Sequence, residues 1–175
     1  ERADVVDMTS CDVIAWLKSE MRMMLDEEIA RAILVGDGRS TSSDDKINEM
    51  NIRPIWKDED LFTIKAAVEV SSTATADQKA KAFIRACVKS RKNYKGSGTP
   101  SLFTTEDVLT DCLLLEDANG RVIYDTEEKL RTALRVKEII TVPVMEGLTR
   151  TDGESNTLSL MGIIVNLADY NVGAD

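Results

Sequence analysis

The feature that most constrains the fold is a long helical pattern near the start of the chain. Apolar residues recur at steps of three and four from Val13 to Ile33, which places them on one stripe of an α-helix. Thr9 or Ser10 is expected to cap this helix and Gly36 to end it. A helix of about 24 residues is about 36 Å long, roughly twice the usual length. We therefore expect it to cross a domain or to extend beyond one.

The rest of the 175 residues alternates between helical and extended patterns, which predicts an α+β fold. Further helices are expected over residues 76–94, from 104 or 105 to 113, and over 125–134. Extended segments are expected over 52–55, 61–70, 101–104, 122–124, 138–145 and 158–167. Polar loops are expected over 37–51 and 147–156. Two capping boxes are predicted, Thr75 with Gln78 and Asp125 with Glu128.

Charge and composition exclude several classes of protein. With 31 acidic and 22 basic residues, the formal net charge is −9, which argues against nucleic acid or an anionic membrane surface as the main partner. No apolar run approaches the roughly 20 residues that span a bilayer, and the charged first residues do not resemble a signal peptide. The three cysteines, Cys11, Cys87 and Cys112, are expected to be reduced, buried thiols.

The sequence offers little for catalysis. Histidine, the commonest general base and metal ligand, is absent. The stretch from Gly96 to Thr99 lacks the spacing of a phosphate-binding loop, so a turn that ends a helix is expected there. Acidic clusters could pair in an acid–base or metal site, but a solvated surface is the expected state of Asp26–Glu28, Asp44–Asp45, Asp58–Asp60 and Asp152 with Glu154. We therefore expect no enzyme, no metal, no cofactor and no small-molecule substrate.

One charged feature differs from the rest of this acidic chain. No acidic residue occurs between Asp77 and Glu106, and the helix predicted there has a basic outer face. Three interpretations remain open, in this order: a solvated face whose basic last turn suits the helix dipole, a contact surface for an acidic region of a neighbouring copy, and weak contact with nucleic acid. The residues predicted for such a contact are Lys81, Arg85, Lys89, Arg91 and Lys92.

Several segments, taken in order, resemble the major capsid proteins of tailed phages, which have the Hong Kong 97-type fold. These segments are Asp12–Arg22, Leu25–Arg39, Asn51–Ile55, Tyr94–Pro100, Val136–Gly147 and Ala168–Asp175. The resemblance runs through nearly the whole chain and rests on the joint order of the segments, because none of them is diagnostic alone.

The resemblance implies a long spine helix plus an axial domain with a mixed central sheet flanked by helices. Residues 1–50 would be the spine helix and following loop of the peripheral domain, 51–167 the axial domain, and 168–175 a return toward the peripheral domain. The N-terminal arm, the hairpin loop and the C-terminal part known in the family have no counterpart here. The resemblance therefore also implies that the chain is a fragment.

The same resemblance implies a function. Such a subunit would assemble with copies of itself into pentamers and hexamers that enclose the genome, with packaged DNA contacted only indirectly and no membrane involved. It would belong to the virion capsid and assemble in the cytoplasm of a bacterial host. An encapsulin-like compartment shell is the alternative, since it shares the fold. Neighbouring portal and terminase genes would favour the phage, and a cargo enzyme gene the compartment.

Overall fold

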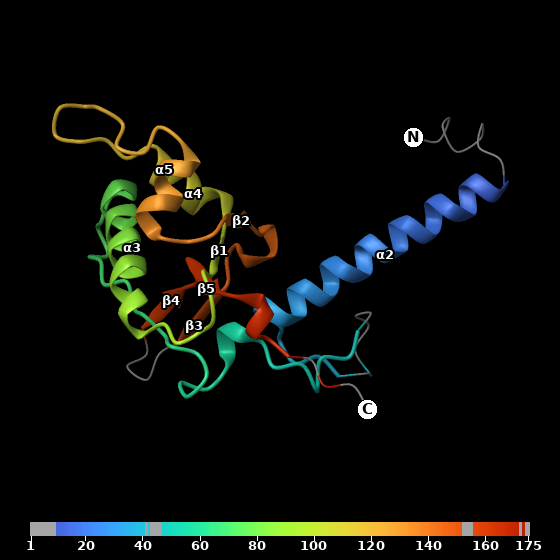
Figure 1. Cartoon of the computed structure of the whole chain (residues 1–175). Coiled ribbons are helices and arrows are strands. Elements are labelled where there is room, and N and C mark those ends of the chain that lie inside the picture. Colours follow the sequence, from blue (N-terminus) through green and yellow to red (C-terminus); the bar gives the residue numbers. More distant parts are fainter. Residues whose placement is uncertain (1–9, 41, 43–46, 152–155, 172, 174–175) are drawn as a thin grey trace. The chain divides into compact units, whose positions relative to one another are not determined.

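The computed structural model describes residues 10–40, 42, 47–151, 156–171 and 173, with side chains from residue 13 onward (Figure 1). The chain divides into two compact units, residues 1–59 and residues 60–175. The described residues contain four α-helices, a mixed three-stranded sheet and a two-stranded hairpin, which confirms the α+β class. The predicted domain boundaries, after residue 50 and after residue 167, remain predictions.

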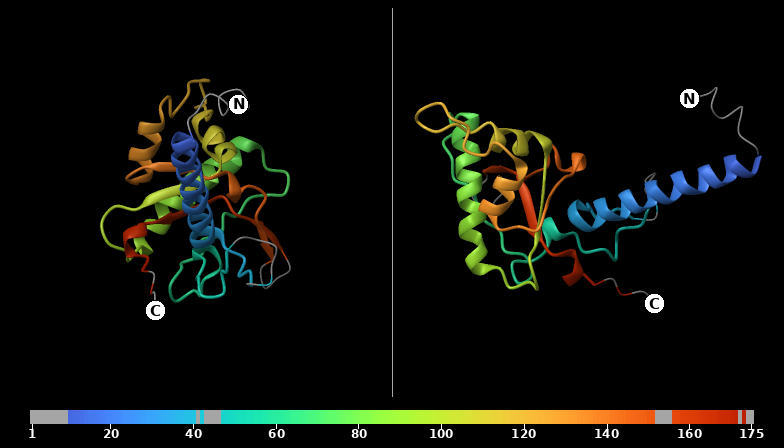
Figure 2. Two further views of the ribbon diagram at one scale, coloured as in Figure 1. Left: turned by 90° about the vertical axis from the view of Figure 1, so that its right-hand side faces the viewer. Right: turned by 45° about the horizontal axis from the view of Figure 1, so that its top comes forward.

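The first unit is built on α2 (Ser10–Val35), the long helix expected from the sequence. It is one continuous helix in each view of Figure 2. The helix ends just before Gly36, as expected. Only glycine fits at this position, because a Cβ atom there would lie 2.5 Å from the carbonyl oxygen of Ala32. A side chain would therefore collide with the last turn of the helix.

Burial along α2 is confined to its C-terminal end, where Ala32, Leu34 and Val35 are buried. The apolar pattern that predicts this helix is therefore exposed over most of its length and is not buried in a core. Eight large apolar side chains are between 40% and 62% exposed: Ile14, Trp16, Leu17, Met21, Met23, Met24, Leu25 and Ile29.

The described residues of the segment 37–51 lie in a loop, as predicted, and the chain then returns to the end of α2. The expected extended segment over residues 52–55 was wrong at its end, because Pro54 leads into a short 3₁₀ helix, η1 (Ile55–Lys57). The indole Nε1 of Trp56 donates a hydrogen bond to the carbonyl oxygen of Gly36, at 3.3 Å. This contact joins η1 to the end of α2.

Three helices of the second unit begin at side-chain caps. In α3 (Ala76–Ser90), the predicted capping box of Thr75 and Gln78 is present, and the 3₁₀ helix η2 (Arg91–Asn93) follows directly. Thr105 caps α4 (Glu106–Leu113). The cap of α5 (Glu127–Leu134) is Thr126, not the predicted Asp125. Asp125 instead pairs with the Lys129 ammonium at 2.8 Å.

The sheet has the strand order β2–β1–β5, with β1 (Ser101–Thr104) in the centre. β2 (Ile139–Thr141) runs parallel to β1, and β5 (Gly162–Val165) runs antiparallel to it. A parallel pair needs a crossover connection, and α4 and α5 lie in that connection. The extended segment expected over 138–145 is shorter than predicted, because Pro143 opens the 3₁₀ helix η3 (Pro143–Met145) just after β2.

The core of this unit lies between the sheet and the three helices, with α3 packed against α4 and α5 (Figures 1 and 2). It contains the buried residues Ala80, Phe83, Cys87, Leu102, Leu109, Cys112, Leu115, Leu130, Leu134 and Val136. Gly162 permits close approach of β5, because a Cβ atom there would lie 3.1 Å from both Leu102 and Phe83. The buried Thr104 hydroxyl donates to the carbonyl oxygen of Met161 at 2.7 Å.

Other expectations for this unit were wrong. Residues 61–70, expected to be extended, form no strand with any described segment. The polar loop expected over 147–156 contains β3 (Thr149–Thr151), which pairs with β4 (Thr157–Ser159). The strand expected over 158–167 is divided at residues 160 and 161 between β4 and β5, and the 3₁₀ helix η4 (Leu167–Asp169) follows.

Candidate functional site

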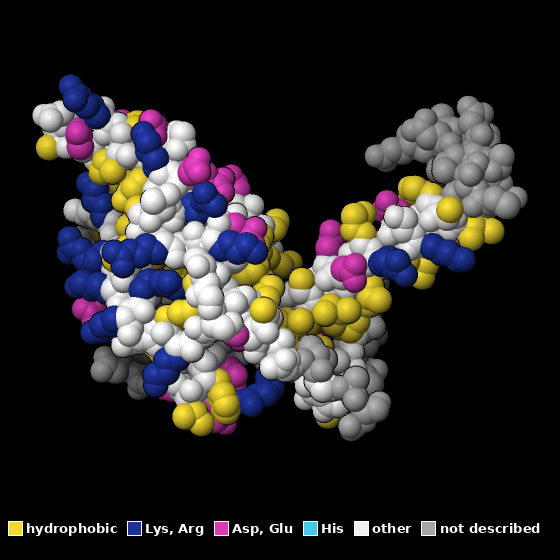
Figure 3. All heavy atoms as spheres, viewed as in Figure 1, with side chains coloured by type: hydrophobic (Ala, Val, Ile, Leu, Met, Phe, Trp, Pro, Cys, Tyr) yellow, Lys and Arg dark blue, Asp and Glu magenta, His cyan; other side chains and the backbone are white. Residues whose placement is uncertain are grey.

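The strongest candidate for a functional surface is the outer face of α3. Its inner face buries Ala80, Phe83 and Cys87 in the core. Three cations four residues apart, Lys81, Arg85 and Lys89, are exposed on the helix. Figure 3 shows Lys and Arg side chains gathered over this part of the molecule. A core-facing stripe at helical spacing thus leaves the basic residues to solvent.

The five predicted contact residues are not equivalent. Lys81, Arg85, Lys89 and Lys92 are exposed, whereas Arg91 is half-buried. The Arg91 guanidinium carbon lies 4.9 Å from the centre of the Tyr94 ring, and its Nη1 is buried without a hydrogen-bond partner. Arg91 thus packs against its own unit, while the other four cations face outward.

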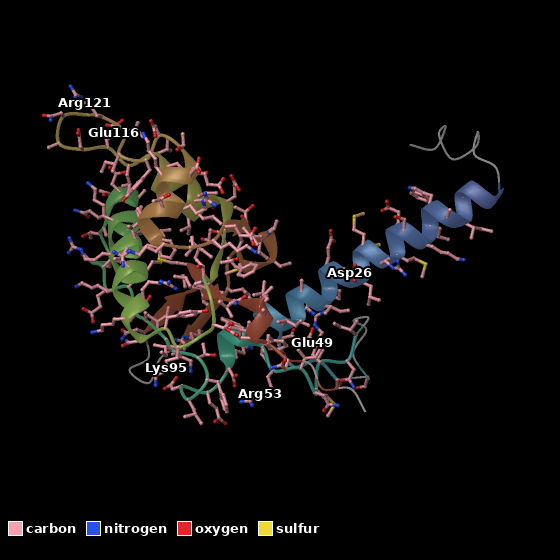
Figure 4. All side chains as sticks on the ribbon, viewed as in Figure 1. Asp26, Glu49, Arg53, Lys95, Glu116 and Arg121 are labelled. Carbon is pink, nitrogen blue, oxygen red and sulfur yellow. The ribbon has the colours of Figure 1, made fainter. Side chains whose placement is uncertain are left out.

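These exposed cations carry uncompensated charge. In the part of the chain that the structure describes, none of Lys81, Arg85, Lys89 and Lys92 forms an ion pair. Lys95, labelled in Figure 4, extends the basic segment beyond η2. A basic surface on a chain of net charge −9 is complementary to the acidic parts of a second copy.

A pocket opens beside the basic face. It has a volume of ≈ 260 Å³ and is lined by Lys81, Ile84, Arg85, Leu115, Ile123 and Tyr124. Two of these residues are cations from α3. The other side of the pocket comes from the connection between α4 and α5. Lys81 and Arg85 were predicted from the sequence as contact residues, and the other four lining residues were not.

The connection between α4 and α5 is held in shape by its own hydrogen bonds. The Ile123 N–H donates to the Leu115 carbonyl at 2.9 Å, and Glu116 pairs with Val122 in an antiparallel bridge. The Asp117 carboxylate accepts the N–H groups of Asn119 and Arg121 at 2.8 and 3.0 Å. Figure 4 shows Glu116 and Arg121 in this connection. The apolar wall of the pocket is therefore part of an ordered turn.

The second polar cluster surrounds Glu49 in the first unit (Figure 4). Glu49 is 1% exposed, and its carboxylate accepts the N–H groups of Asp37 and Gly38 at 2.9 and 3.2 Å. Arg31 donates to Glu49 and also, at 2.6 Å, to Glu28. The hydrogen bond that Arg31 donates to Glu28, together with its contact with Glu49, raises the pKa of Arg31. The pairing of Arg31 with Glu49 compensates both of these charges, and it holds the loop that follows α2 against the end of the helix.

The residues considered for catalysis have other partners or are buried. Burial raises the pKa of Cys87 and of Cys112 to about 12, so both thiols stay protonated at neutral pH. Both are free and buried, as predicted, while Cys11 lies outside the described side chains. In the turn that contains Gly96, the carboxylate of Asp169 accepts the Ser97 N–H at 2.8 Å. The Ser97 N–H is therefore already hydrogen-bonded within the chain.

The acidic runs do not form a metal site among the described residues, where no group of three or more potential ligands occurs. Asp26 projects from the exposed part of α2 (Figure 4). Asp58 pairs with Arg53 at 2.7 Å. Asp44, Asp45, Asp152 and Glu154 lie outside the described residues.

Comparisons of the chain with protein-family models, with curated proteins and with solved structures find no match. Among the helices that the structure describes, none combines the length and the apolar character needed to cross a membrane.

Proposed function

We propose that this chain is the spine helix and axial domain of a tailed-phage major capsid protein with the Hong Kong 97-type fold. Such a subunit is structural and has no enzymatic activity. It assembles with copies of itself into pentamers and hexamers that enclose the genome. Assembly takes place in the cytoplasm of a bacterial host, and the product is the virion capsid.

The observation that carries the proposal is the exposed apolar surface of α2. Eight large apolar side chains are at least 40% exposed along this helix. Exposed apolar patches of this kind mark surfaces that bind other proteins. The unpaired cations of α3 form a second surface that suits a partner. The order of the resembling segments supports a capsid subunit as the kind of protein that needs such surfaces.

Electron microscopy of the protein expressed alone from its whole gene tests the proposal. We expect closed shells, or rings of five and six subunits, because repeated symmetric interfaces generate closed assemblies. A monodisperse monomer at every protein and salt concentration tested would overturn the proposal.

Substitutions on α2 link the result to the surface that motivates it. Met24→Lys places a charge on the exposed apolar surface and should abolish assembly. Ser19→Lys makes the same charge change at an exposed polar position of the same helix and should leave assembly intact. Equal yields of shells from the two variants would contradict a role for α2.

Substitutions near the end of α3 test the basic surface. Neutralising Lys89 and Lys92 with Gln should lower the assembly yield, because both cations are exposed and unpaired. Arg91 is left unchanged, since its packing on Tyr94 would confound the result. Normal assembly of the variant at all salt concentrations would exclude a subunit contact through these two lysines.

A further inference from the structure

The pocket beside α3 has a chemical character that limits what it can bind. Ile84, Leu115, Ile123 and the Tyr124 ring offer an apolar surface, and Lys81 and Arg85 add two positive charges. Its volume of ≈ 260 Å³ is below the roughly 300–1,000 Å³ of most small-molecule sites. The ligand that suits this pocket is a protein segment with an apolar side chain, which would contact the apolar lining, and neighbouring carboxylates, which would pair with the two cations.

The chain itself contains such a segment. Leu61 is 82% exposed, more than any other large apolar side chain in the described part of the chain, and Ile64 is 52% exposed. Two exposed carboxylates, Glu59 and Asp60, directly precede Leu61. Asp60 contacts Lys65 at 2.7 Å, but its side chain is 83% exposed. A surface ion pair of this kind contributes little and can exchange partners.

This segment does not fill the pocket of its own chain, because Leu61 is almost fully exposed to solvent. The segment and the pocket are two different surfaces of one molecule. Contact between them in two copies is therefore heterologous, and it forms a closed ring when the rotation between neighbours closes. Rings are the form that pentamers and hexamers take.

We propose that the segment 59–64 of one copy docks into the α3 pocket of a neighbouring copy. Leu61 enters the pocket, and the carboxylates of Glu59 and Asp60 lie next to Lys81 and Arg85. The inference deepens the proposed function, on which it rests, by naming the two surfaces that meet between subunits.

A peptide of residues 57–65, carrying a fluorophore, is the probe for the pocket. Its binding to the whole chain is measured by fluorescence anisotropy. We expect saturable binding that weakens roughly tenfold or more when Leu61 of the peptide is replaced by Ala, as for a central apolar anchor. Equal binding of the two peptides would overturn the proposal.

The receptor side is tested with two charge-matched variants. Lys81→Glu with Arg85→Glu reverses the charges at the pocket and should abolish peptide binding. Lys79→Glu with Lys137→Glu makes the same change in net charge at exposed positions outside the pocket and should retain most binding. Circular dichroism establishes that both variants are folded. Loss of binding in both variants alike would reduce the effect to net charge and overturn the proposal.

Charge exchange between copies gives the most specific test. The pocket variant and a segment variant, Glu59→Lys with Asp60→Lys, should each fail to self-associate in analytical ultracentrifugation. Mixed together, they should associate, because each reversed surface then meets an opposite charge. A mixture that remains monomeric, while the unmodified chain self-associates, would overturn the docking.

The outcomes separate this contact from the proposed function. If the unmodified gene product and the pocket variant both form shells, the docking is wrong and the capsid function stands. If the gene product never assembles but the peptide binds the pocket as described, the capsid function is wrong and the docking stands.

Discussion

Glu49 is the carboxylate with the most constrained environment among the described residues of the first unit. It accepts two backbone N–H groups and the Arg31 guanidinium while it is almost fully buried. A buried charge is tolerated only when it is paired and hydrogen-bonded, since desolvation otherwise costs several kcal/mol. The Glu49 side chain is therefore one of the main contacts that close the loop onto α2.

Glu49→Gln should lower the free energy of unfolding of the first unit by about 1.5–3 kcal/mol, the usual contribution of hydrogen bonds to a charged group. Urea unfolding is followed by the emission of Trp56, which contacts Gly36, in a Trp16→Phe background. The control is Glu27→Gln, at an exposed position on α2, which should change stability by no more than about 0.5 kcal/mol. Equal losses in the two variants would contradict the role given to Glu49.

The buried thiols predict a pH dependence of the second unit. Desolvation raises the pKa of Cys87 and Cys112 from 9.0 to about 12 in the folded state. An unfolded thiol loses its proton at lower pH than a folded one, so high pH favours the unfolded chain. The contribution of the thiols is complete below pH 9 and is lost as the pH rises toward 12.

Urea titrations between pH 8 and pH 11 measure this dependence. The free energy of unfolding should fall more steeply with pH in the unmodified chain than in a Cys87→Ala, Cys112→Ala variant. Lysines and tyrosines titrate in both proteins, so the difference between the two slopes isolates the thiols. Parallel slopes would show that the thiols do not titrate differently on unfolding.

At the scale of single elements, the start of α3 is fixed by a reciprocal pair of hydrogen bonds. The Thr75 hydroxyl accepts the Gln78 N–H, and the Gln78 side chain accepts the Thr75 N–H at 3.1 Å. Both bonds satisfy N–H groups that the helix leaves without partners. The basic face and the pocket both depend on this helix.

Thr75→Ala should destabilise the second unit by about 1 kcal/mol, the typical cost of losing an N-cap side chain. Thr110→Ala is the matched control, because Thr110 is exposed inside α4 and alanine suits a helix interior. Urea unfolding followed by far-ultraviolet circular dichroism compares the two. A control that loses as much stability as Thr75→Ala would count against the cap.

The helices could be predicted from the sequence because their signals are local. Thr75 with Gln78 and the apolar spacing that follows them lie within a few turns of one another. The hairpin of β3 and β4 gives no such signal, since Thr149, Thr151, Thr157 and Ser159 are exposed and show no apolar alternation. Residues 61–70 have the opposite character. Their alternation predicts a strand, but no described strand pairs with them, so the pattern has no sheet to join.

The candidate site divides in the same way. Its cations could be identified from the sequence, because the absence of acidic residues between Asp77 and Glu106 is a local property. The apolar wall could not, since Leu115, Ile123 and Tyr124 follow α3 only after a strand and another helix. The inward packing of Arg91 depends on Tyr94 and on a backbone that changes from α-helix to 3₁₀ helix. The spacing of the cations therefore predicts an exposed Arg91, like Lys89 and Lys92, although the structure packs it inward.

At the scale of the whole molecule, the two units have separate spectroscopic reporters. Trp16 and Trp56 are the two tryptophans of the chain, and both belong to the first unit. Most of the regular structure outside α2, by contrast, belongs to the second unit. Tryptophan emission therefore follows one unit, while mutations in the sheet act on the other.

Leu102→Ala should lower the free energy of unfolding of the second unit by about 2–5 kcal/mol, the range for a large-to-small change in a core. Leu102 is buried in the central strand and pairs with Ile139 and Ile164. Circular dichroism should report this shift, and tryptophan emission should not. An equal shift of both signals would show that the chain unfolds as a single cooperative unit.

The strand order also determines when the sheet can form as the chain is made. β1 lies in the centre but is synthesised first, and its partners at residues 139–141 and 162–165 come much later. At roughly 5–20 residues per second, β5 leaves the ribosome several seconds after β1. During that interval Leu102 and Phe103 lack the strands that cover them in the finished sheet. The nascent chain therefore exposes apolar residues of the central strand that the folded chain buries.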